Sequence, residues 1–154
     1  MLASEHFTYA ELTRSQAATR ASLPNQPSRL ARTALETLCN YILEPVRANF
    51  GPVHVSSGYR SPAVNALIGG SSSSQHMKGE AADIECAIVS NLVLAKWIRD
   101  TLDFDQLILE FYNENDPRAG WVHVSYRAKG NRNESLVARS VNGKTAYSKG
   151  LPIA

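Results

Sequence analysis

The longest hydrophobic pattern in the chain begins after Ser28 and predicts an amphipathic helix. Its apolar residues recur at intervals of three and four positions, which places them on one helical face. They are Leu30, Ala34, Leu35, Leu38, Ile42 and Val46. Pro45 lies inside this pattern, and we expect it to kink or locally end the helix because proline has no backbone N–H to donate. Gly51 and Pro52 then end the helix.

Shorter patterns predict the other elements. Stretches that favour strands cover residues 53–57, 80–86, 105–112 and 120–127, and stretches that favour helices cover 62–68 and 90–101. Near the N-terminus, Thr8 and Glu11 have the spacing of a capping box and predict a short helix. The polar segment 113–118 favours a turn, so the third and fourth strands are predicted to form an antiparallel hairpin. At the C-terminus, Asn142-Gly143 between two short strands predicts a second hairpin.

Together these elements predict an α+β fold, in which a small antiparallel sheet is flanked by helices. The length of 154 residues is typical of one domain, and we interpret 1–154 as a single domain. Residues 1–27 are interpreted as an N-terminal helix and an ordered surface loop packed on that domain, because so short a helix does not fold alone. Residues 134–149 are interpreted as the C-terminal hairpin.

Composition and charge narrow the class of protein. The net charge is +2 and the basic residues are scattered, which argues against a nucleic-acid partner. No apolar stretch is long enough to predict membrane insertion. Residues 1–16 do not resemble a signal peptide, so we expect synthesis in the cytoplasm. The two cysteines, Cys39 and Cys86, lie in apolar patterns and are interpreted as buried free thiols.

Candidate metal ligands lie in the serine-rich stretch from Ser71 to Asp83. His76 and Asp83 are seven positions apart in this stretch, and His123 lies on the predicted fourth strand. Zinc accepts histidine nitrogen and carboxylate oxygen at about 2.0–2.2 Å, and a catalytic zinc site has three protein ligands and one open position. The three residues would supply such a set, although a histidine on a strand is also compatible with a purely structural role.

Glu110 is the candidate general base. It is a carboxylate between Leu109 and Phe111 in a mostly apolar strand, where burial is costly unless the group is paired or takes part in chemistry. If the third and fourth strands pair, Glu110 and His123 project from the same face of the sheet. The alternative interpretation of Glu110 is a salt bridge on an edge strand.

Three blocks of the sequence resemble a known family. They are Ser56-Ser57-Gly58-Tyr59-Arg60-Ser61-Pro62, Ser74-Gln75-His76-Met77-Lys78-Gly79-Glu80-Ala81-Ala82-Asp83 and Trp121-Val122-His123-Val124-Ser125. They resemble the D-Ala-D-Ala carboxypeptidase and dipeptidase family of zinc peptidases, peptidase family M15. The resemblance runs from Phe7 through the fourth strand and is greatest to small phage and prophage members of the endolysin type. It implies a fold similar to that of hedgehog and D,D-peptidase domains.

The resemblance also implies roles for individual residues. His76, Asp83 and His123 match the family's zinc ligands. Arg60 matches the arginine that stabilises the developing oxyanion, and a guanidinium suits this role because it stays charged. Ser74 matches a position near the metal that binds substrate, and it is equally suited to orienting its loop. Gly79 is expected to permit a backbone conformation that brings the ligands together.

The chain departs from the family pattern at the position of the general base. Many members carry the catalytic glutamate three residues before the last histidine, where this chain has Gly120. Small phage-type members use a glutamate on the preceding strand instead, which matches Glu110. Glu114, in the polar loop, is the second candidate.

The function implied by the resemblance is that of a zinc-dependent peptidase. Its substrate would be a peptide bond in the stem peptides or cross-bridges of bacterial peptidoglycan, cut as a carboxypeptidase or as an endopeptidase. The alternative is a non-catalytic wall-binding or virion structural protein that retains the fold. We expect a monomer that reaches the wall through holin-type release or as part of a virion.

Overall fold

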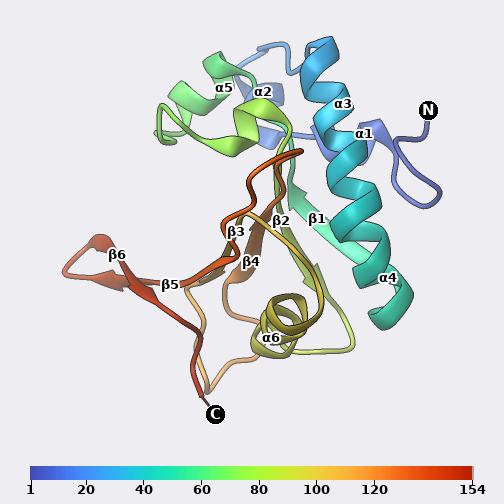
Figure 1. Ribbon diagram of the computed structural model, residues 1–154. Helices are drawn as coiled ribbons and strands as arrows, with labels where there is room; N and C mark the ends of the chain where they lie inside the picture. Colours follow the sequence, from blue (N-terminus) through green and yellow to red (C-terminus); the bar gives the residue numbers. More distant parts are fainter. Residues whose placement is uncertain (154) are drawn as a thin grey trace.

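The computed structural model describes residues 1–153 as one six-stranded sheet with helices around it (Figure 1). The helical elements are α1 (Tyr9–Thr13), α2 (Gln16–Arg20), α3 (Arg29–Leu38), the π-helical η1 (Cys39–Leu43), α4 (Glu44–Phe50), α5 (Pro62–Leu67), the 3-10 helix η2 (Gln75–Lys78) and α6 (Asn91–Thr101). The strands are β1 (Val53–Ser57), β2 (Ala81–Cys86), β3 (Gln106–Glu110), β4 (Trp121–Ser125), β5 (Glu134–Val141) and β6 (Lys144–Lys149). The predicted α+β class is confirmed.

The order of strands in the sheet is β1-β2-β4-β3-β5-β6. Four of the neighbouring pairs are antiparallel, as expected, but β3 and β5 are parallel. The prediction of a purely antiparallel sheet is therefore wrong at this one pair. The chain leaves β4 beside the start of β3, and β5 begins at that same end, with Glu134 opposite Gln106. The Asn-Gly turn specifies how β5 pairs with β6, but not which edge of the sheet this hairpin joins.

The helix predicted after Ser28 is interrupted just before Pro45, as expected. Segment η1 is π-helical, and the Glu44 N–H donates to the carbonyl of Cys39, five residues earlier. This wider turn accommodates a proline ring that would otherwise clash with the preceding turn. The predicted capping box at Thr8 is present, with Glu11 as its partner. The surface loop expected after α1 instead contains the short helix α2.

The sheet has one apolar face and one polar face. The apolar face carries Ala82, Ile84, Leu107, Leu109, Val122, Val124 and Val137, which are all buried in the core. Helix α6 packs against β2, β3 and β4, and Figure 1 shows it below the sheet, with the long α3–α4 helix beside β1. Since strand residues alternate between faces, Asp83, His123 and Glu110 share the other face. Cys39 and Cys86 are buried free thiols, as predicted.

The N-terminal segment supports the loop that follows β1. The Tyr59 N–H donates to the carbonyl of Leu12, and the Asn25 side chain bonds both the Tyr59 carbonyl and the Ser61 N–H. Residues 1–27 thus fix the loop that carries Arg60. Among residues 1–153 we find no helix whose length and apolar character would allow it to cross a membrane.

The segment just before the C-terminal hairpin is held to the sheet by an ion pair between buried Asp105 and half-exposed Arg132. Asp105, which is 1% exposed, accepts hydrogen bonds from Arg132 Nε at 3.1 Å and Nη2 at 2.9 Å. The hairpin itself turns at Asn142 and Gly143, whose φ angles of 52° and 77° suit a type I′ turn, as predicted. In Figure 1 the hairpin projects to one side of the molecule.

The Asp105–Arg132 pair predicts a dependence of stability on pH. Burial raises the pKa of Asp105, but the hydrogen bonds and charge of Arg132 outweigh it, so the pKa lies below its ordinary value. The carboxylate therefore stabilises the fold above the unfolded-state pKa of about 3.9, and this contribution is lost as the pH falls through the lower folded-state pKa. Urea denaturation between pH 6 and about 3 should show a shallower loss of stability in Asp105→Asn than in wild type. Parallel curves would contradict this role.

Candidate active site

The three predicted metal ligands come together on the polar face of the sheet. Asp83 on β2 lies directly opposite His123 on β4, and His76 reaches them from η2, which precedes β2. His76 Nε2 lies 3.4 Å from Asp83 Oδ1, and His123 Nδ1 lies 3.0 Å from the same oxygen. One ligand atom from each residue lies within 4.8 Å of the other two. Ligand atoms of a tetrahedral zinc site are roughly 3.3 Å apart, so these residues are suitably placed to hold zinc.

The orientation of the His76 ring is fixed by a second hydrogen bond. Its Nδ1 lies 2.7 Å from the carbonyl oxygen of Gly58, and a carbonyl only accepts, so Nδ1 carries the proton. This leaves Nε2 as the ring nitrogen that faces Asp83. Metal-binding histidines commonly use their other nitrogen in this way. The orientation of the His76 ring therefore fits the geometry of a metal site.

Two glycines allow this loop to approach its neighbours closely. Gly79 has a φ of +73°, and a Cβ atom there would lie 2.3 Å from the carbonyl oxygen of Ala31. Gly58 is equally confined, with a Cβ position 2.2 Å from the Leu12 carbonyl oxygen. No larger residue fits at either position without moving the backbone. The conformational role predicted for Gly79 is therefore confirmed, and Gly58 has a comparable one.

Asp83 is held in its ionised form. Burial alone would raise its pKa, but hydrogen bonds and charge from His123 and His76 hold the pKa far below its ordinary value. An ionised carboxylate is the form that binds a metal.

Glu110 lies at the end of β3, one strand beyond His123. Its Oε2 accepts a hydrogen bond of 2.7 Å from Trp121 Nε1, and Trp121 is its direct partner across the β3–β4 pair. Burial, followed by the negative charge of Asp83, raises the pKa of Glu110 above its ordinary value. A carboxylate that is partly buried, oriented and more basic than usual is suited to accepting and returning a proton.

The backbone at Gly120 explains why the base is not three residues before His123. Gly120 has a φ of +73°, and a Cβ atom would lie 1.9 Å from the carbonyl oxygen of Glu110. No side chain fits there. Glu114, the other candidate, lies in the exposed loop and lines a separate cavity with Phe111 and Arg139. The geometry thus favours Glu110 over Glu114.

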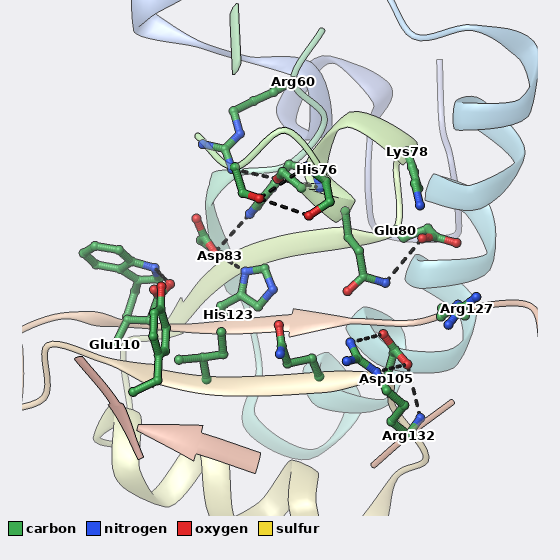
Figure 2. A pocket seen from close by; sticks show the side chains of 18 residues that line it. Arg60, His76, Lys78, Glu80, Asp83, Asp105, Glu110, His123, Arg127 and Arg132 are labelled. Atoms are coloured by element: carbon green, nitrogen blue, oxygen red, sulfur yellow. Dashed lines mark hydrogen bonds and ion pairs between the residues drawn. The ribbon is translucent and has the colours of Figure 1, made fainter. Parts of the chain in front are cut away.

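Arg60 faces the same space from the loop after β1 (Figure 2). Its Nη2 lies 3.4 Å from Ser74 Oγ, while its buried Nε has no hydrogen-bond partner among the described residues. Burial lowers the pKa of Arg60, and the nearby Asp83 and Glu110 carboxylates oppose this shift. Ser74 also accepts a hydrogen bond from the His76 N–H, so it orients both Arg60 and the metal-binding loop.

A cavity of about 630 Å³ joins these residues. Figure 2 shows Glu110 at one end, the metal ligands and Arg60 in the middle, and Lys78, Arg127 and Arg132 at the other end. A cavity of this size accommodates a short peptide segment.

Sequence reasoning missed two residues of the site. Gly58 contributes through its backbone carbonyl, so the glycine in the sequence indicated only a turn. By strand alternation Trp121 shares a face of β4 with His123, and this is the one sequence signal that it lies beside Glu110.

Comparison with known proteins agrees with this geometry. A sequence profile of the family described as Peptidase M15 matches residues 5–125, more than three quarters of the chain. This chain belongs to the peptidase M15 family. The matched segment contains the three candidate metal ligands, Glu110, Arg60 and Ser74, whereas Arg127, Arg132 and strands β5 and β6 lie outside it.

Within the M15 family, the chain is similar to the zinc D-Ala-D-Ala carboxypeptidase of Streptomyces albus G, with 34% identity over 97 residues. The aligned region covers 62% of this chain but only 37% of that relative, so the chain spans little more than a third of its length. Family membership and the His–Asp–His cluster together support zinc as the cofactor.

Proposed function

We propose that this protein is a zinc metallopeptidase that hydrolyses a peptide bond in bacterial peptidoglycan. The observation that carries the proposal is the convergence of three metal-ligand atoms, a basic carboxylate and a buried guanidinium in one cavity. Membership of the M15 family and similarity to a zinc D-Ala-D-Ala carboxypeptidase support the substrate class.

Each residue of the site has its own role in the proposed reaction. His76, Asp83 and His123 would hold zinc, which when bound polarises the scissile carbonyl and lowers the pKa of water. Glu110 accepts the proton of the attacking water and returns it to the leaving amine. The Trp121 N–H holds Glu110 in position for both transfers. Arg60, fixed by Ser74, donates to the carbonyl oxygen as negative charge develops there.

The bond cleaved is either the terminal one of a stem peptide or one within the stem or cross-bridge. Mass spectrometry of peptidoglycan digested by the zinc-loaded protein distinguishes these. A carboxypeptidase releases single alanine residues, whereas an endopeptidase creates new amino and carboxyl termini within larger fragments. Binding to the wall without any new terminus would instead indicate a non-catalytic wall-binding or virion structural protein.

We also propose a setting for this activity. The motif blocks around Arg60, His76 and His123 resemble those of small phage and prophage enzymes of the endolysin type. On this basis the protein acts as a monomer on the wall, after holin-type release from the cytoplasm or as part of a virion.

A further inference from the structure

The C-terminal hairpin supplies a residue to the active-site cavity. Tyr147 on β6 lines the same cavity as the metal ligands and Glu110, although it follows Glu110 by 37 positions in the sequence. It lies outside the segment that matches the family profile, which ends at residue 125. Tyr147 is 57% exposed and therefore accessible to a bound molecule.

Strand register places Tyr147 in line with Glu110. Glu110 is directly opposite Trp121 on one side and Ala138 on the other, and Ala138 is directly opposite Tyr147. Residues directly opposite each other project from the same face of a sheet. The row Trp121, Glu110, Ala138, Tyr147 therefore crosses four strands on the face that carries the metal ligands.

Glu110 and Tyr147 lie two strands apart in this row. Adjacent strands are about 4.8 Å apart, so the backbones of Glu110 and Tyr147 are separated by roughly 10 Å. Ala138, between them, is fully buried and does not line the cavity, whereas the side chains of Glu110 and Tyr147 both do. Tyr147 therefore lies beside Glu110 at this end of the cavity.

The direction of proton transfer decides which part of a substrate lies between Glu110 and Tyr147. If Glu110 returns a proton to the leaving amine, as the proposed function requires, the leaving amine lies within hydrogen-bond reach of Glu110. In the strand order, β3, β5 and β6 extend away from the ligand-bearing strands β2 and β4. The leaving group then extends from the metal centre past Glu110 and towards Tyr147.

We propose that Tyr147 is a substrate-positioning residue whose ring contacts the leaving-group side of the peptide substrate. The C-terminal hairpin, through Tyr147, forms the outer wall of this subsite. This inference rests on the proposed peptidase function, and it assigns to the hairpin a part in substrate selection.

The test compares Tyr147→Ala, Tyr147→Phe and the matched control Ser148→Ala. Ser148 is adjacent on β6 and exposed, but it projects from the opposite face, opposite Val137. With soluble muropeptides as substrate, Tyr147→Ala should raise KM roughly two- to tenfold, the range of a single aromatic contact, with kcat nearly unchanged. Tyr147→Phe should restore the wild-type KM because it keeps the ring. Ser148→Ala should behave as wild type.

A wild-type KM in Tyr147→Ala, or no rescue by phenylalanine, would overturn the proposal. A second experiment tests the Tyr147 contact separately from the peptidase proposal. The same muropeptides are titrated calorimetrically into Glu110→Gln protein, with and without the Tyr147→Ala substitution. If wild type binds muropeptides but cleaves none, the peptidase proposal fails, while weaker binding without Tyr147 still supports the contact. Equal binding, or none in either protein, overturns the contact.

Discussion

Replacement of His123 by alanine is expected to abolish both zinc binding and peptidase activity. His123 is one of the three residues of the cluster that each offer a ligand atom, and two remaining ligands do not form a stable catalytic zinc site. Without zinc, the pKa of the attacking water would rise back towards that of bulk water and the carbonyl would not be polarised, so activity should fall on the order of a thousandfold or more. Metal analysis should find about one zinc ion per chain in wild type and almost none in the variant.

The matched control is His54→Ala. His54 is also a strand histidine, but it lies exposed on β1 and outside the cluster. It should keep full zinc content and activity. The His123→Ala protein should remain folded, because the apolar core lies on the other face of the sheet, and circular dichroism would check this. Full activity in a zinc-free His123→Ala protein would contradict the metal centre.

Replacement of Glu110 by glutamine is expected to remove activity while leaving zinc in place. Glutamine keeps an oxygen that accepts the Trp121 hydrogen bond, so the local structure should persist, but the amide does not take up a proton at neutral pH. Loss of a general base lowers rates by about a hundredfold to ten-thousandfold. The effect should appear in kcat, with little change in KM, since the lost interaction is made in the transition state.

Glu114→Gln is the control for this experiment. Both residues are glutamates near the β3–β4 connection, but only Glu110 lines the cavity with the metal ligands. Glu114→Gln should retain wild-type kcat. An inactive Glu114→Gln together with an active Glu110→Gln would move the base to the loop and overturn the assignment.

The local elements of this fold could be predicted from the sequence. The capping box at Thr8, the interruption before Pro45 and the turn at Asn142-Gly143 each depend on neighbouring residues, and each is present. The polar face of the sheet was equally predictable, because side chains alternate along a strand. Strand alternation alone placed Trp121 and His123 on one side of β4.

The motif blocks identified the candidate ligands but not their arrangement. The ring orientation of His76 depends on the carbonyl of Gly58, eighteen residues earlier. Every residue has a backbone carbonyl, so the residue type does not show which carbonyl makes this contact. The exclusion of a base at Gly120 depends on the close approach of the Glu110 carbonyl. Both effects come from the distance between separate chain segments, so only the folded structure contains them.

From the sequence alone, the candidate metal ligands and the candidate base follow from the resemblance of the motif blocks to the M15 family, and the strands that carry them follow from short-range periodicity. The tertiary structure decided the parallel pairing of β5 with β3, which the hairpin sequence left open because a turn specifies only its own two strands. That pairing aligns Tyr147 with Glu110. The wall of the active-site cavity therefore depends on long-range register, which no local pattern encodes.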